Sequence, residues 1–211
     1  MTRGPRVLLS FLVALVALPA FAGKASLDFW EKSPVLWKEF RDERKIFVSA
    51  KEVDGRTESL GAGLVDAPLQ KVWAFANDPE KIKKTTALLE DFKWDRESGK
   101  VELHLKLLTF RYLIKGIATP KPDPENPKIE FRVLEGDIVP FTAELELRSA
   151  KAQALRDGAP AFPEGKTLVR IFGQSSPDRS LSWPLRVALE AVLQRVAGTL
   201  RQAVESESTS P

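Results

Sequence analysis

The fold of this chain is decided by residues 64–80, which read LVDAPLQKVWAFANDPE. Asp66 is a favourable N-cap residue and Pro68 suits a first helical turn, so we predict a helix from Pro68 to Ala76 that directly follows a strand. The Asn-Asp-Pro sequence after this helix interrupts it, and residues 80–84 are expected to form one more short turn. The stretch therefore predicts the order strand, helix, break, helix.

Apolar and polar residues alternate on both sides of this stretch. Before it, strands over Lys45–Val53 and Thr57–Val65 are joined by Asp54-Gly55, a strong hairpin signal because both positions tolerate positive φ. After it, the alternation predicts six further strands, which are Leu88–Trp94, Val101–Leu107, Phe110–Ala118, Lys128–Leu134, Phe141–Arg148 and Thr167–Phe172. Consecutive short strands predict an antiparallel meander. Residues 150–165 form a long Ala-, Pro- and Gly-rich loop, which is either a flap or an insertion.

The last predicted element is a long amphipathic helix over Pro184–Glu205. Its apolar residues recur at steps of three and four, and they are Leu185, Leu189, Val192, Val196, Leu200 and Ala203. Such a helix must lay one face on an apolar surface.

The first 22 residues have the features of a cleavable signal peptide. Arg3 and Arg6 precede an apolar run that ends in Ala20-Phe21-Ala22, with small residues at the two positions that a signal peptidase reads. The run has about 13 residues, too few for the ~20 that cross a bilayer as a helix, so an uncleaved anchor is the minority alternative. We expect cleavage after Ala22 and export to the periplasm or the extracellular space.

Composition narrows the classes of function. The chain has 32 Lys and Arg against 29 Asp and Glu, and removing residues 1–22 takes away two arginines and no acids. The charges that remain are nearly balanced and interleaved, so dedicated nucleic-acid binding is not expected. The absence of cysteine excludes disulfides. We expect a signal peptide over residues 1–22, a docking segment over 23–44, one domain over 45–205 and a disordered tail over 206–211.

This order of elements resembles the START-like helix-grip fold of the SRPBCC superfamily. Residues 64–80 follow the family's opening strand, Asp-Ala-Pro, helix and Asp-Pro-Glu break, and residues 173–176, Trp183-Pro184 and the terminal helix match its last strand and gripping helix. The resemblance covers about residues 45–205 and is nearest to the coenzyme Q-binding and polyketide cyclase/dehydrase type. The chain departs from it in the second strand before Asp66 and in the loop over residues 150–165.

The resemblance implies an α+β fold in which an antiparallel sheet curves around a long C-terminal helix. In this family the space between sheet and helix holds an apolar molecule such as a lipid, sterol, quinone or polyketide. The candidate cavity residues are Tyr112, Ile114, Phe131, Val133, Phe141, Leu145, Leu189, Val192, Val196 and Leu200. Periodicity indicates which face is buried and not whether that face encloses a void, so a closed core and an open cavity both remain possible.

The inventory of catalytic side chains is thin. The single histidine, His104, alternates with leucines and is expected on the polar face of a strand; no metal site or cofactor is predicted. Serines over residues 175–182 have no histidine after them, so a Ser-His nucleophile is unsupported. Acidic residues over 91–97 are expected to form an exposed hairpin. Arg132 and Arg170 either anchor an anionic head group or, as alternation favours, face solvent.

Three classes of function follow from these observations. The first is an exported, noncatalytic binding protein for a hydrophobic small molecule, expected to be monomeric and compatible with transient membrane contact. The second is a cyclase or dehydrase that works in the same cavity. The third is an interaction domain with a closed core, which would use exposed Trp30, Trp37 or Trp183 to meet a protein or a membrane.

Overall fold

The protein is described by a computed structural model over residues 34–107, 109–137, 140–149, 165–177 and 179–209. The predicted signal peptide, residues 23–33 of the docking segment, most of the loop over 150–165 and the end of the tail lie outside the described residues. Within the described ranges, no helix combines the length and the apolar character needed to cross a membrane.

The core of the fold is an eight-stranded sheet in which all neighbouring strands are antiparallel, in the order β1-β2-β8-β7-β6-β5-β4-β3. The strands are β1 Phe47–Val53, β2 Arg56–Val65, β3 Leu89–Trp94, β4 Lys100–Leu107, β5 Phe110–Lys121, β6 Lys128–Gly136, β7 Phe141–Ser149 and β8 Thr167–Ser175. Each corresponds to a strand predicted from the alternation. The turn at Asp54-Gly55 has positive φ at both residues, as the hairpin prediction requires.

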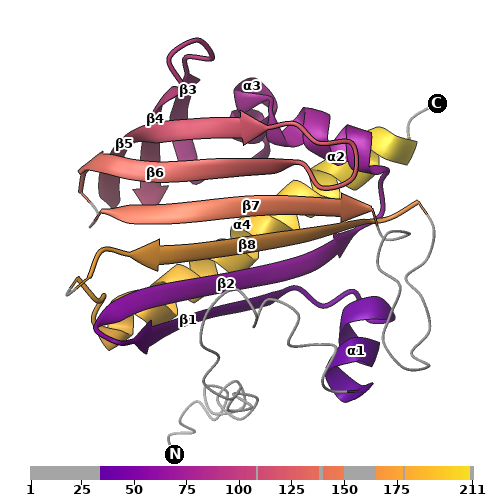
Figure 1. Ribbon diagram of the computed structural model, residues 1–211, viewed down its shortest axis with the longest axis horizontal. Helices are drawn as coiled ribbons and strands as arrows, with labels where there is room; N and C mark the ends of the chain where they lie inside the picture. Colours follow the sequence, from indigo (N-terminus) through magenta and orange to yellow (C-terminus); the bar gives the residue numbers. More distant parts are fainter. Residues whose placement is uncertain (1–33, 108, 138–139, 150–164, 178, 210–211) are drawn as a thin grey trace, which may run out of the picture.

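One long helix, α4 (Trp183–Thr209), crosses one face of this sheet, and two short helices, α2 (Leu69–Ala76) and α3 (Pro79–Thr85), lie near its C-terminal end (Figure 1). The helix packs mainly on β1 and β2. This arrangement confirms the α+β helix-grip prediction.

The start of α2 differs from the prediction. Pro68, and not Asp66, is the N-cap, and no side chain caps the helix. The Asp66 carboxylate instead lies 3.5 Å from Lys166 Nζ, while the Asp66 backbone N–H donates to Glu205 Oε1 at 2.8 Å. Asp66 therefore links the segment before α2 to the residue that precedes β8 and to the C-terminal part of α4.

The two faces of the sheet are fixed by strand register. Leu145 pairs with both Ile129 and Ile171 on neighbouring strands, so these side chains share the face that looks toward α4. Phe47 lies on the opposite face, where its ring stacks on that of Phe40, with centroids 5.8 Å apart. Phe40 belongs to the short helix α1 (Pro34–Arg41) and is fully buried.

Between the sheet and α4, close packing is concentrated at one end. A cluster of buried apolar side chains joins α2, the C-terminal half of α4 and the strands beside them; its members are Val65, Ala67, Leu69, Val72, Phe75, Leu147 and Val204. A smaller cluster of Val101, Ala118 and Ile129 lies on β4, β5 and β6. The N-terminal half of α4 lies beyond the larger cluster.

Candidate ligand-binding site

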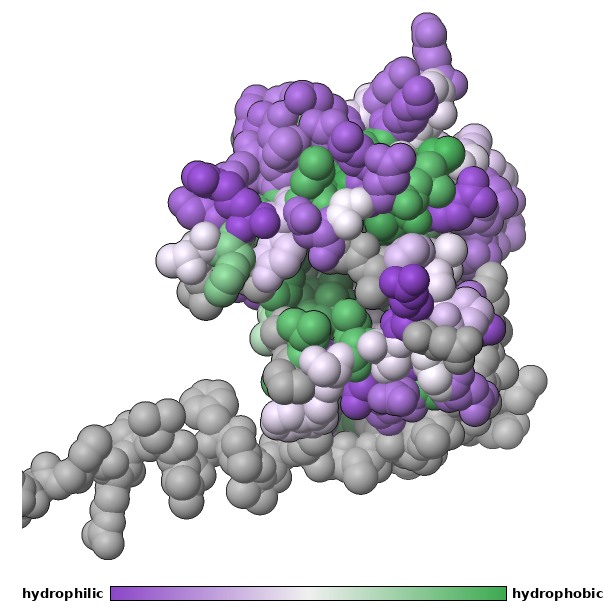
Figure 2. Space-filling view, turned by 90° about the vertical axis from the view of Figure 1, so that its left-hand side faces the viewer, coloured by the Kyte–Doolittle hydropathy of each residue, from purple (hydrophilic) through white to green (hydrophobic). Residues whose placement is uncertain are grey.

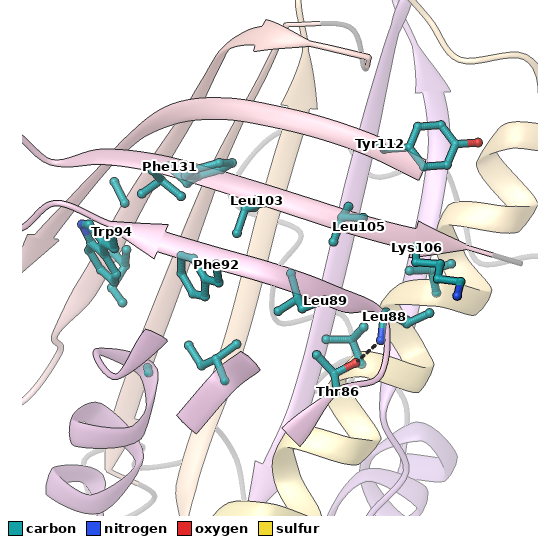
Figure 3. A pocket seen from close by; sticks show the side chains of 17 residues that line it. Thr86, Leu88, Leu89, Phe92, Trp94, Leu103, Leu105, Lys106, Tyr112 and Phe131 are labelled. Atoms are coloured by element: carbon teal, nitrogen blue, oxygen red, sulfur yellow. Dashed lines mark hydrogen bonds between the residues drawn. The ribbon is translucent and has the colours of Figure 1, made fainter. Parts of the chain in front are cut away.

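A cavity of about 360 Å³ lies between α4 and the strands β3 to β6. Its walls are aliphatic and aromatic side chains, mainly Leu89, Phe92, Trp94, Val101, Leu103, Leu105, Tyr112, Ala118, Ile129, Phe131, Val192 and Val196. Trp94 stands at one end of this cavity and Tyr112 at the other (Figure 3). The Arg96 guanidinium lies over the Trp94 ring, 3.5 Å from its centroid. We call this space the β3–β6 cavity.

A second cavity of about 230 Å³ lies between α4 and the strands β1, β2, β7 and β8. Ala76, Ile82 and Val196 line both cavities, so the two adjoin around these three side chains. Gly61 on β2 is part of the wall of this second cavity. A Cβ at this position would come within 2.6 Å of Ile171 Cγ2, so the position has no room for a larger residue. The space between sheet and helix is therefore not a closed core.

The surface is hollowed at the end of the molecule that lies on the left in Figure 1. Figure 2 shows this hollow, with hydrophobic residues on its inner surface. Several large apolar side chains are also exposed on elements that begin or end at this side, and they are Phe110, Leu134, Trp183, Leu185 and Val187.

Six of the ten predicted cavity residues line one of the two cavities, and these are Tyr112, Phe131, Leu145, Val192, Val196 and Leu200. Ile114 and Val133 are buried in the sheet without lining either cavity. The Phe141 ring packs directly on Gly173 and lines neither cavity. A Cβ on Gly173 would lie only 2.4 Å from Phe141 Cε1. Leu189 is half-buried and lines neither cavity.

Many of the side chains of the β3–β6 cavity that the sequence reasoning missed come from β3 and β4, among them Leu89, Phe92, Trp94, Leu103 and Leu105. Their alternation was visible, because Leu103 and Leu105 flank His104. What was missing was the curvature of the sheet, which brings its β3 edge round to face α4.

Among the described residues, four side chains with polar groups line the β3–β6 cavity: Thr86, Trp94, Lys106 and Tyr112. The Trp94 indole N–H is buried without a hydrogen-bond partner in the described ranges. The Thr86 hydroxyl accepts a hydrogen bond from the Leu88 backbone N–H at 3.3 Å. Lys106 is fixed through its backbone, because its N–H donates to the Leu88 carbonyl at 2.8 Å. Within the described part of the chain, neither the Lys106 ammonium nor the Tyr112 hydroxyl has a hydrogen-bond or ion-pair partner.

The candidate acid and base groups lie outside the cavity. His104 is on the opposite face of the sheet, as predicted, where its Nε2 lies 2.7 Å from Glu102 Oε1. A hydrogen bond from Lys83 lowers the pKa of Asp91, and hydrogen bonds from the Ser98 side chain and the turn backbone lower that of Asp95. Asp91 thus joins β3 to α3, and Asp95 stabilises the exposed turn after β3. Among the described residues, no three potential ligands gather into a metal site.

The expectation that Arg170 faces solvent is wrong. Arg170 pairs directly with Glu146 across β8 and β7, and the two side chains, ion-paired, are only 4% and 5% exposed. Burial by itself would raise the pKa of Glu146. The positive charge of Arg170 and the hydrogen bonds from Arg148 and Arg170 have the larger effect, so the pKa of Glu146 is lowered below its usual value. Arg132 is exposed, as predicted. Both arginines lie on the face away from the cavities, so neither holds a ligand there.

No protein-family model and no curated protein matches this sequence. Solved structures do resemble it. An aromatase/cyclase, ZhuI, from Streptomyces sp. R1128 is 19% identical over 72% of this chain and 93% of its own, with a TM-score of 0.51. A protein of unknown function from Staphylococcus aureus is 11% identical over 74% of this chain and 97% of its own, with a TM-score of 0.53.

A START superfamily protein from Mycobacterium smegmatis is 10% identical over 72% of this chain and 96% of its own, with a TM-score of 0.48. At these identities the likeness concerns the fold alone. With its eight-stranded antiparallel sheet around a long C-terminal helix, the chain has the START-like helix-grip fold.

Proposed function

We propose that this protein is a noncatalytic binding protein for a hydrophobic small molecule held between the sheet and α4. The observation that carries the proposal is the 360 Å³ β3–β6 cavity with its almost wholly apolar walls. Pockets for small molecules occupy roughly 300–1,000 Å³ and have mainly apolar linings with a few polar groups. The adjoining 230 Å³ cavity extends the space available to a longer ligand.

Binding of this kind is driven by removal of apolar surface from water, at about 25 cal/mol per Å² before ordering costs are subtracted. Directional contacts are few, because the polar side-chain groups of the lining that have no partner in the described part of the chain are the Lys106 ammonium, the Tyr112 hydroxyl and the Trp94 indole N–H. Selectivity would then rest on shape and on these three side chains. A lipid, a quinone or a polyketide-like molecule fits this description.

We further propose that the protein acts after export, as a monomer in the periplasm or outside the cell. Support for export comes from the sequence of residues 1–22, with Arg3 and Arg6 ahead of the apolar run. An apolar ligand moving through an aqueous compartment needs a carrier, which is consistent with this proposal.

A cyclase or dehydrase is the second candidate, favoured by the likeness to the fold of an aromatase/cyclase. Such an enzyme needs an acid and a base that both reach the substrate. Of the side chains that line the β3–β6 cavity, only Lys106 and Tyr112 titrate, and both lie at the same end (Figure 3). The carrier proposal requires no such pair.

The test is to purify the full chain from its own host without detergent and to record native mass spectra, followed by organic extraction and identification of the released molecule. A bound apolar molecule, released unchanged, is expected. Protein unfolded and refolded in the absence of lipid serves as the control and should bind the neutral dye Nile red with enhanced fluorescence. The carrier proposal fails if native protein carries nothing and refolded protein does not bind the dye. Release of a chemically altered molecule would favour the enzyme.

A further inference from the structure

The polar end of the β3–β6 cavity has a definite chemistry. Leu105 on β4 pairs with Tyr112 on β5, and Lys106 is the next residue along β4. Figure 3 shows Tyr112 and Lys106 at the same end of the cavity. Lys106 is exposed and lies where the cavity meets the surface, so its long side chain can bring the ammonium to a group at the mouth.

The charges around this end leave the Lys106 ammonium uncompensated. Arg111 pairs with Lys106 across the hairpin, and its Nε lies 3.1 and 3.2 Å from the two carboxylate oxygens of Glu90. Glu90 is thus engaged by Arg111. No carboxylate in the described part of the chain is within ion-pair distance of Lys106, and no described side chain hydrogen-bonds to Tyr112.

We infer that the ligand is an amphiphile whose apolar body fills the cavity and whose acidic oxygen head group lies at the mouth, against Lys106 Nζ and Tyr112 Oη. The inference rests on the proposed function and adds a class of ligand to it. An ammonium and a phenolic O–H both donate hydrogen bonds, and bonds to a charged oxygen are stronger than those between neutral groups. With a wholly apolar ligand, the Lys106 ammonium and the Tyr112 hydroxyl could donate hydrogen bonds only to water.

The inference is tested with probes that share one oleyl or oleoyl chain and differ in the head group. Each probe displaces Nile red from the refolded full-length protein, and the probes are oleate, oleoyl lysophosphatidic acid and the neutral oleyl alcohol. We expect at least one acidic probe to bind about tenfold more tightly than the alcohol, which corresponds to 1.4 kcal/mol. The stronger of the two acidic probes tells whether the head group is a carboxylate or a phosphate.

Two variants assign this preference to the named side chains. Lys106→Met keeps the apolar stem and removes the charge, so it should abolish most of the preference while leaving the affinity for the alcohol unchanged. Tyr112→Phe should reduce the preference severalfold. The matched control is Lys115→Met, which removes an exposed lysine of β5 that does not line the cavity. It should leave all three affinities unchanged.

The possible failures are distinguishable. Equal binding of acidic and neutral probes to the unmodified protein overturns the head-group inference and leaves the apolar carrier intact. The same holds if Lys106→Met weakens the alcohol as much as the acids, since the effect would then come from lost packing. If neither Nile red nor any probe binds, the proposed function fails and the inference fails with it.

Discussion

Filling the cavity from the helix side should displace the ligand without unfolding the protein. Val196 lines both cavities, so the substitution Val196→Trp places an indole where they adjoin. The new side chain is larger by about seven heavy atoms, and at about 0.8 kcal/mol per buried CH₂ the displaced ligand carbons are worth about 6 kcal/mol. The ligand can shift within the remaining space, so we expect at least a hundredfold loss of Nile red affinity, about 2.7 kcal/mol.

Stability should change much less than binding. Overpacking a filled core costs about 1–3 kcal/mol, whereas here the added atoms enter an existing void, so the melting temperature should fall by no more than a few degrees. Gln194→Trp adds the same side chain to an exposed position of α4 and should leave binding unchanged. If Val196→Trp does not fold, Leu103→Trp fills the same cavity from β4. Folded variants that still bind Nile red normally would refute the cavity as the binding site.

Two further predictions concern stability and export. Glu146→Gln removes the partner of a buried arginine and should cost about 3 kcal/mol, whereas Glu130→Gln, which breaks an exposed pair on the same sheet face, should cost under about 1 kcal/mol. Because the folded-state pKa of Glu146 is lowered, its contribution is fully present above its unfolded pKa of about 4.3 and is lost progressively as pH falls from that value through the lower folded-state pKa. Denaturant melts at pH 7 and pH 3 should therefore show the variant's deficit shrinking. N-terminal sequencing of the exported protein should give Gly23 as the first residue, and an intact Met1 on soluble protein would contradict the export proposal.

The strands and helices could be predicted because each leaves a local pattern in the sequence. Alternation located all eight strands, and Asp54-Gly55 located the first hairpin. The N-cap of α2 was mispredicted because the Asp66 carboxylate lies near Lys166 and its backbone N–H binds Glu205, and both partners are far away in sequence. Local propensity carries no information about such partners.

The candidate site was predicted only in part, for a similar reason. Alternation correctly gave the face of Tyr112, Phe131 and Leu145, but whether a residue on that face meets a void or a neighbour depends on the curvature of the sheet. Ile114 and Val133 share the pattern and are buried away from the cavities. Arg170 was assigned to solvent because its neutralising partner, Glu146, is on another strand. Pairing across strands has to be known before burial of a charge can be predicted.

The position of the cavity mouth follows from the way α4 is held. Along one side the helix is bound to β1 and the residues before it: the Ala50 backbone N–H donates to Glu190 Oε1 at 2.5 Å, Arg186 Nη1 lies 2.8 Å from Glu52 Oε2, and Arg201 Nη1 donates to the Arg44 carbonyl at 2.6 Å. Toward β3–β6 the helix presents Val192 and Val196 across the β3–β6 cavity. A ligand that entered between α4 and these strands would separate apolar surfaces and leave the polar contacts to β1 intact. The helix α4 can therefore stay bound to β1 while an apolar molecule enters between α4 and the strands β3 to β6.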